Sequence, residues 1–199
     1  MIQLSELKNE FAELIHLPKH ERMLKLTALL TSYFKKDKIK PIIVGGLSVE
    51  IYTRNNYTTY DIDLITDGRE KFDKLLVHEL GFLKKGRSWY HRQLEISIEI
   101  PDNYLEGNSK KVLEIELDNG HHIFVIGVED IIIHRLESAM VSHPNNPEWT
   151  DDYEWAERMF FIHKDDKDMM DIDYLLQASE KADVHFIIKN WLKNLREDI

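Results

Sequence analysis

The sequence predicts an α/β (α+β) protein, in which a mixed β-sheet flanked by helices is followed by a C-terminal helical region. Two observations predict the sheet, since apolar and polar residues alternate with a period of two over Tyr60–Ile65 and again over Gln93–Ile100. In the last third of the chain, apolar residues recur at helical spacing instead. We therefore expect three parts, which are N-terminal helices at residues 1–37, a sheet-containing core at 38–127 and helices at 128–199.

The composition is that of a soluble globular protein. The 199 residues are 43% hydrophobic and 31% charged, and no apolar run approaches the ~20 residues of a membrane span. The formal net charge of −10 argues against a broadly nucleic-acid-binding surface, because phosphate contacts need clustered Lys and Arg. The chain has no cysteine, which excludes disulfides and thiolate zinc sites. Together with an N-terminus that does not resemble a signal peptide, these features favour the cytoplasm and no membrane partner.

The first 37 residues predict two helices. Leu4, Leu7 and Phe11 have the spacing of one helical face, and Pro18 permits a second start. A second apolar stripe runs from Met23 to Phe34. We expect both helices to pack on the core without contributing to chemistry. The basic stretch 35–38 that follows, like the one at 84–87, is interpreted as a solvated turn.

The core begins with a strand–helix–strand unit. Pro41–Val44 is a short β-branched run that ends at Gly45-Gly46, a pattern typical of a buried strand that turns into a helix. The next residues, 47–54, predict that helix, and a polar turn at Asn55-Asn56 leads into the strand Tyr60–Ile65.

This unit carries two kinds of candidate ligand group. Asp61 and Asp63 lie two residues apart on a strand, so both carboxylates point the same way. Such a pair is costly without a cation, and Mg²⁺ prefers carboxylate oxygens together with substrate phosphate. The glycine pair, Gly45 and Gly46, opens a helix whose N-terminus favours an anion such as phosphate. The combination indicates a nucleoside triphosphate (NTP) site.

The order Gly45-Gly46, helix, Thr59-Tyr60-Asp61-Ile62-Asp63-Leu64 resembles the minimal nucleotidyltransferases of the DNA polymerase β superfamily. It is most similar to the bacterial GG…T-x-D-x-D-L group that includes AbiEii-type toxins and DUF6036-like proteins. The likeness covers roughly residues 39–128. One departure is Tyr57, since many relatives carry an arginine just before the threonine motif, whereas this chain has Arg54 slightly upstream.

The resemblance implies a nucleotidyltransferase fold and a site of defined parts. Gly45 and Gly46 contact the phosphates of the nucleotide, and we expect Ser48 to help steady them. Asp61 and Asp63 bind Mg²⁺, with two ions expected, and a third carboxylate on a neighbouring strand completes the metal site.

The third carboxylate has two candidates. In the strand predicted over Gln93–Ile100, Glu95 and Glu99 share the polar face but lie about 13 Å apart at the rise of a strand. Only one of them can therefore reach a metal held by the two aspartates directly. We favour Glu99 because it stands late in the strand, where ligands usually meet the edge of an open sheet.

The remaining elements predict support for the core. Phe72 and Leu76 mark a helix over 68–80, and two strands at 111–117 and 121–126 are expected to form a hairpin across Asp118-Asn119-Gly120. Four helices are expected after residue 127. Relatives of the AbiEii type place a basic residue in the first of these helices and an Asp in the next. Arg135 and Asp152 stand at roughly those places, either as site residues or as an inter-helix ion pair.

Two functions follow as expectations. The first is Mg²⁺-dependent transfer of a nucleoside monophosphate from an NTP to an acceptor hydroxyl, possible acceptors being a protein, a small molecule or RNA. The resemblance adds a role in a toxin–antitoxin pair or defence system, with a partner protein. The alternative is a catalytically inactive module of the same fold that binds nucleotide or a partner.

Overall fold

The computed structural model describes residues 2–118 and 120–197. Contacts within the chain divide it into two compact units, which meet in sequence at Ile126 and Gly127. The first unit contains the whole sheet, and the second is helical. Among the described helices, none is long and apolar enough to cross a membrane.

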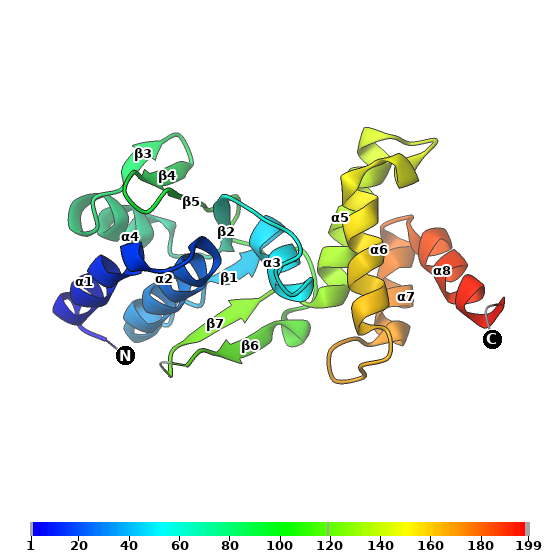
Figure 1. Cartoon of the computed structure of the whole chain (residues 1–199), viewed down its shortest axis with the longest axis horizontal. Coiled ribbons are helices and arrows are strands. Elements are labelled where there is room, and N and C mark those ends of the chain that lie inside the picture. The colour runs from blue at the N-terminus through cyan, green and yellow to red at the C-terminus, as the bar shows by residue number, and fades with distance from the viewer. Residues whose placement is uncertain (1, 119, 198–199) are drawn as a thin grey trace. The chain divides into compact units, whose positions relative to one another are not determined.

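The first unit interleaves helices with short strands (Figure 1). Its helical elements are α1 (Leu4–Glu13), η1 (Leu14–His16), α2 (Lys19–Phe34), η2 (Lys35–Asp37), α3 (Gly45–Tyr52), α4 (Arg69–Lys74), the π-helical η3 (Leu75–Glu79) and η4 (Ser109–Lys111). Its strands are β1 (Ile42–Val44), β2 (Asp61–Ile65), β3 (Leu83–Lys85), β4 (Ser88–His91), β5 (Ile96–Glu99), β6 (Leu113–Glu116) and β7 (His122–Val125).

The strands form one seven-stranded sheet in the order β3-β4-β5-β2-β1-β7-β6. The sheet is mixed, because β2 pairs with β5 and β1 with β7 in parallel, whereas β1 and β2 run antiparallel. The predicted mixed sheet flanked by helices is therefore confirmed. β1 and β2, the two strands joined by α3, lie near the centre of the sheet.

As the alternation in β2 predicts, its apolar and acidic side chains lie on opposite faces of the sheet. Ile62 and Leu64 are completely buried, whereas Asp61 and Asp63 on the opposite face are half-buried. Fully burying an aliphatic side chain stabilises a fold by about 1.5–3 kcal/mol, so a one-residue shift in register would be strongly disfavoured. Helices complete the core, and a stacked pair of rings, Phe34 of α2 and Phe72 of α4, joins two of them with centroids 4.5 Å apart.

The strand predicted over residues 93–100 is shorter in the structure and begins at Ile96. It starts late because β4 and β5 form an antiparallel hairpin, in which Trp89 pairs with Ile98, and the chain must turn between the two strands. Residues 92–95 make the turn of that hairpin, and Glu95 adopts a positive φ of 51° there. Glu95 and Glu99 therefore do not share a strand face, contrary to the sequence-based expectation.

The second predicted hairpin is present. β6 pairs antiparallel with β7, with Glu116 opposite His122 and Leu113 opposite Val125. Of the three predicted turn residues, Asp118 and Gly120 are described, and Asn119 lies outside the described residues.

The second unit is built from helices alone in its described part. They are α5 (Val128–Ser142), the short η5 (Pro147–Trp149), α6 (Asp151–His163), α7 (Ile172–Lys181) and α8 (His185–Glu197). Thr150 and Asp171 cap α6 and α7, because their side-chain oxygens accept hydrogen bonds from the N–H groups of Tyr153 and Tyr174. The four long helices that the sequence predicts after residue 127 are confirmed.

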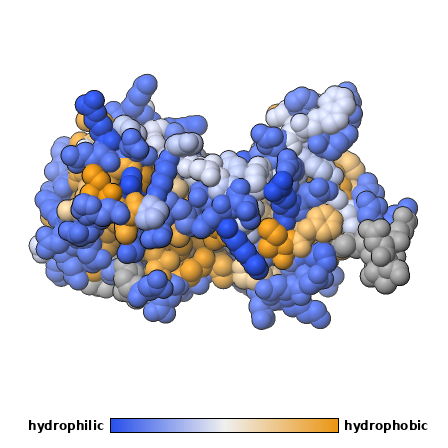
Figure 2. Space-filling view, in the orientation of Figure 1, coloured by the Kyte–Doolittle hydropathy of each residue, from blue (hydrophilic) through white to orange (hydrophobic). Residues whose placement is uncertain are grey.

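Hydrophilic residues cover much of the face shown in Figure 2, with smaller apolar areas between them. This surface agrees with a chain that carries 36 acidic and 26 basic residues.

Candidate functional site

The passage from β1 into α3 contains no loop, and Gly45 makes it possible. This residue has φ = +61°, a conformation that side chains of L-residues rarely adopt. A Cβ atom at this position would also lie only 2.2 Å from Oδ2 of Asp63. Position 45 therefore requires glycine for two reasons, its backbone conformation and the lack of space for a side chain. The Asp63 carboxylate lies directly against the start of α3.

Residues that follow Gly45 stabilise this turn through packing and a hydrogen bond. A Cβ atom at Gly46 would lie 2.6 Å from the hydroxyl oxygen of Thr59, so the helix start and the threonine motif are packed in contact. Ser48 is completely buried, and its hydroxyl donates to the carbonyl oxygen of Gly45 at 2.7 Å. In this conformation Ser48 fixes the shape of the turn, and its hydroxyl is not exposed to a ligand.

Three carboxylates are placed on one face of adjacent strands. Within the parallel pair β2–β5, Asp61 is in register with Ser97, and Asp63 is in register with Glu99. Residues in register point to the same side of a sheet, so Asp61, Asp63 and Glu99 share the face opposite the buried isoleucines. All three are half-buried.

Hydroxyl groups hold two of these carboxylates. Thr59 donates its Oγ1 proton to Oδ1 of Asp61 at 2.7 Å, and Ser88 of β4 donates to Oε1 of Glu99. The guanidinium Nε of Arg87 lies 3.8 Å from the other oxygen of Glu99. Glu95, in contrast, is exposed in the β4–β5 turn.

A buried acid on α3, which the sequence does not single out, braces the segment before β2. Glu50 is 4% exposed, and its Oε2 accepts the backbone N–H of Thr59 at 3.1 Å. Its other oxygen lies 3.0 Å from Nδ1 of His20. Glu50 therefore connects α3, the start of α2 and the threonine motif. Nothing in its local sequence signals this, because the contact joins segments thirty residues apart.

A second residue that the sequence does not single out is Lys19, the first residue of α2. Its ammonium lies 3.4 Å from the centroid of the Tyr60 ring, next to Asp61 in the chain. Burial lowers the pKa of Lys19, while Glu95, Glu50 and Asp61 act in the opposite direction. Lys19 therefore supplies positive charge at the edge of an otherwise acidic face.

The donor set of this face suits a hard divalent cation, because carboxylate oxygens are the ligands that Mg²⁺ prefers. Among residues 2–118 and 120–197, however, no three His, Asp or Glu side chains are grouped closely enough to hold a metal ion. Asp61 and Glu99 are instead hydrogen-bonded to Thr59 and Ser88. Glu99 accepts the Ser88 hydrogen bond on Oε1, and its second oxygen, Oε2, lies 3.8 Å from Nε of Arg87.

Arg135 and Asp152 form an ion pair between α5 and α6. The guanidinium Nη1 lies 2.7 Å from Oδ1 of Asp152, and both side chains are half-buried. The structural alternative for these two residues, an inter-helix ion pair, is therefore present within the second unit.

Solved structures that are similar to this chain include the following two. An antigenic nucleotidyltransferase-like protein from Paracoccidioides brasiliensis matches with a TM-score of 0.55 at 13% identity, over 86% of this chain and 92% of that chain. The antibiotic-resistance factor ANT(2'')-Ia, known from a solution structure, has a TM-score of 0.45 at 13% identity, over 96% and 97% of the two chains. No family model and no curated protein sequence matches.

The first likeness, together with the mixed sheet, shows that the chain has a nucleotidyltransferase fold. At 13% sequence identity, this likeness supports a conclusion about the fold and none about the reaction. The narrower resemblance to AbiEii-type and DUF6036-like proteins stays a prediction from the motif.

Proposed function

We propose that this protein is a Mg²⁺-dependent nucleotidyltransferase, which transfers a nucleoside monophosphate from an NTP to an acceptor hydroxyl. One observation supports this above the others. The parallel register of β2 and β5 sets Asp63 beside Glu99, on the face that also carries Asp61 and adjoins the glycine turn at Gly45.

The chain's own groups divide the work between binding and orientation. The first N–H groups of α3, beginning at Gly45, have no partner within the helix and suit the phosphates of the nucleotide. Lys19 adds a cation near Asp61. Ser48 and Thr59 hold the turn and the first aspartate in place. Positioning and fixed charge are the main protein contributions to phosphoryl transfer.

In the reaction, the acceptor oxygen bonds to the α-phosphorus and its proton passes to a carboxylate of this face. The bond between the α-phosphorus and the oxygen that bridges to the β-phosphate breaks, and pyrophosphate leaves. Asp61, Asp63 and Glu99 are the residues that would hold Mg²⁺. When bound, Mg²⁺ neutralises charge on the triphosphate and makes the acceptor hydroxyl more acidic.

The test uses the full chain with Mg²⁺, a cell extract and each NTP, labelled in turn on the α- or the γ-phosphate. We expect label to reach an acceptor from the α-position and not from the γ-position, and the class of labelled molecule identifies the acceptor. Asp61→Asn and Asp63→Asn are expected to abolish labelling. Transfer of γ-label would contradict the proposal, because it would indicate a kinase.

A second function, a nucleotide-binding module without turnover, is favoured by a different observation. Asp61 and Glu99 are held by Thr59 and Ser88, and the described residues contain no preformed three-ligand metal group. Under this alternative, NTP binding is retained, α-label is never transferred, and Asp61→Asn changes affinity only modestly.

The acceptor class is proposed from the net charge, and the biological setting from the motif. A net charge of −10 favours a protein or small-molecule acceptor over a long nucleic acid. A toxin–antitoxin role rests on the AbiEii-like motif alone. Its test is growth of a bacterial host during expression, where the wild type is expected to slow growth and Asp61→Asn is not.

A further inference from the structure

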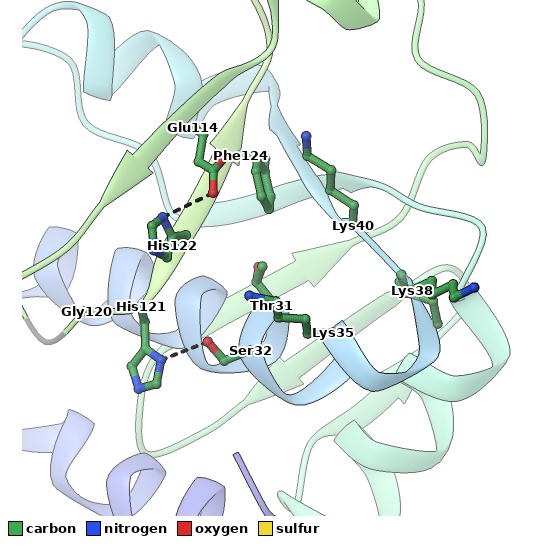
Figure 3. A pocket seen from close by; sticks show the side chains of 11 residues that line it. Thr31, Ser32, Lys35, Lys38, Lys40, Glu114, Gly120, His121, His122 and Phe124 are labelled. Carbon is green, nitrogen blue, oxygen red and sulfur yellow. Dashed lines mark hydrogen bonds and ion pairs between the residues drawn. The ribbon is translucent and has the colours of Figure 1, made fainter. Parts of the chain in front are cut away.

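A second concave site lies in the first unit, where the end of α2, η2 and the β6–β7 hairpin meet (Figure 3). It is a half-open cavity of about 280 Å³. This size is near the lower end for sites that bind small molecules. Its charged lining residues are Lys35, Lys38, Lys40 and Glu114, together with the imidazoles of His121 and His122.

The charge of this cavity is opposite to that of the whole protein. Three lysines line the cavity, and two carboxylates lie there: Glu114, and Glu10, whose Oε1 lies 3.6 Å from Nε2 of His121, in a chain whose formal net charge is −10. A local excess of cations on an acidic protein is not explained by the average composition. It favours a small anion, since the surrounding negative charge opposes a long polyanion.

The polar floor is fixed by contacts within the protein. Ser32 of α2 lies with its hydroxyl oxygen 2.8 Å from Nδ1 of His121, and Thr31 donates to the carbonyl oxygen of Thr27 at 2.8 Å. On the other side, Nδ1 of His122 lies 3.2 Å from Glu114. Figure 3 shows both imidazoles tied in this way. The two rings are therefore oriented before any ligand arrives.

One wall of the cavity is aromatic. The Lys40 ammonium lies 3.8 Å from the centroid of the Phe124 ring, and Ile39 adds apolar surface. Lys38 differs from the other lysines, because its ammonium points away from the two histidines in Figure 3. The lining thus has Lys35 and the two imidazoles at one place and the Phe124 ring, with Lys40 beside it, at another, which suits a ligand that has one charged and one apolar end.

This cavity is separate from the candidate active site. Lys40 precedes β1, whereas Gly45 follows it, so the two sites lie at opposite ends of that strand. Five residues of extended chain span roughly 16 Å. The neighbouring strand agrees, because Ile42 at the start of β1 is in register with Phe124 of the cavity, and Val44 at its end is in register with Asp63.

We propose that this cavity binds a small organic phosphate, with the phosphoryl group between Lys35 and the two histidines and the apolar body against Phe124. A phosphate monoester carries close to two negative charges near neutral pH and three acceptor oxygens, which suits the Lys35 ammonium and two imidazoles better than the single charge of a carboxylate does.

The test is calorimetric titration of the full chain with phenyl phosphate, inorganic phosphate and benzoate. We expect phenyl phosphate to bind more tightly than either of the others. Lys35→Gln should weaken phenyl phosphate binding roughly tenfold, the effect of losing one charge-assisted contact. The matched control is Lys38→Gln, which removes the same charge nearby from a side chain that points away and should change affinity by less than about twofold.

Nuclear magnetic resonance separates this site from the nucleotide site. Phenyl phosphate is expected to shift the ring signals of His121 and His122 while the amide signals of Gly45 and Gly46 stay in place. Shifts at the glycines alone, an equal loss in Lys35→Gln and Lys38→Gln, or benzoate binding as tight as that of phenyl phosphate would each overturn the proposal. Phenyl phosphate binding can also be measured with Asp61→Asn, in which we expect nucleotidyl transfer to be lost. The two proposals can therefore fail independently of each other.

Discussion

Glu99 and Glu95 stand four residues apart in the chain but in different surroundings. Glu99 ends β5 in register with Asp63 and accepts a hydrogen bond from Ser88, whereas Glu95 is exposed in a turn. Only Glu99 therefore lies on the same strand face as the two aspartates.

Glu99→Gln keeps the shape of the side chain and removes its charge. We expect it to reduce nucleotidyl transfer by roughly a hundredfold or more, because a carboxylate proposed to hold Mg²⁺ is lost. Glu95→Gln is the matched control and should be close to wild type. The measurement is the initial rate of α-label transfer, with thermal unfolding as a check on folding. The reverse ranking would move the third carboxylate to Glu95.

Lys19 offers a second test at the level of one side chain. Its ammonium packs on Tyr60 and is close enough to interact with Asp61. If it contacts the triphosphate, Lys19→Gln should raise KM for NTP roughly tenfold, as expected for one charge-assisted hydrogen bond.

Lys36→Gln is the control for this test, because the Lys36 ammonium lies 4.3 Å from the centroid of the Tyr33 ring in a similar contact elsewhere. It should leave KM unchanged. An equal effect of the two substitutions would show that net charge, and not position, is responsible.

The residues of the site were predictable to different degrees. The period of a strand places Asp61 and Asp63 on one face without knowledge of the fold. Lys19 and Glu50 could not be predicted as neighbours of that face, because their contacts join segments far apart in sequence. The hydrogen bond from Ser88 to Glu99 could not be predicted either, because the sequence does not clearly indicate the strand that contains Ser88.

At the level of elements, the glycine pair has a packing role in addition to the phosphate-binding role that we propose for it. Gly46 leaves room for Thr59, and Gly45 adopts a left-handed backbone conformation against Asp63. We therefore expect a substitution here to affect stability together with the proposed nucleotide binding. This differs from a phosphate-binding loop that is fully open to solvent, where binding alone would change.

Gly46→Ala should lower the free energy of unfolding by about 1–3 kcal/mol, the usual cost of overpacking. The double variant with Thr59→Ala should recover part of this loss, because the closest clashing atom, the Thr59 hydroxyl oxygen, is gone. Urea unfolding of the wild type, both single variants and the double variant gives the coupling energy. Strictly additive effects would mean that Gly46 and Thr59 are not in contact.

The boundaries of the elements were harder to predict than their existence. The alternation over residues 93–100 correctly indicates a strand, but the same pattern continues into the turn before Ile96. Alternation cannot distinguish the last turn residues from the first strand residues. The left-handed conformation of Glu95 ends the extended chain, and no residue type at that position announces it.

At the level of the whole molecule, the fold class followed from two periods in the sequence, two residues in the strands and 3.6 in the helices. The cavity near Lys35 did not follow from them. Its lysines lie around η2 and the start of β1, and its histidines lie on or next to β7, so only the fold brings them together. From the sequence alone, the basic stretch at 35–38 is interpreted as a solvated turn for this reason.

The stability of the folded chain should depend on pH through His91. Its ring packs against Phe11 and Phe82, with centroids 5.2 and 5.0 Å away, and its Nδ1 accepts the backbone N–H of Leu94. Burial lowers the pKa of His91 below its ordinary value of 6.5. Between the lowered pKa and 6.5, the unfolded chain binds a proton that the folded chain does not bind. The free energy of unfolding therefore falls as the pH drops below about 6.5, and this contribution is complete above it.

His91→Gln removes the titrating ring and keeps an oxygen that can accept the N–H of Leu94. We expect the variant to be less stable than the wild type at pH 8, because contacts with the two phenylalanines are lost. Between pH 6.5 and 5, however, its free energy of unfolding should decrease less steeply than that of the wild type. Urea unfolding at several pH values from 5 to 8 measures both slopes. Parallel curves for the two proteins would show that His91 takes up its proton equally in the folded and unfolded states, and that the acid sensitivity of the fold arises elsewhere.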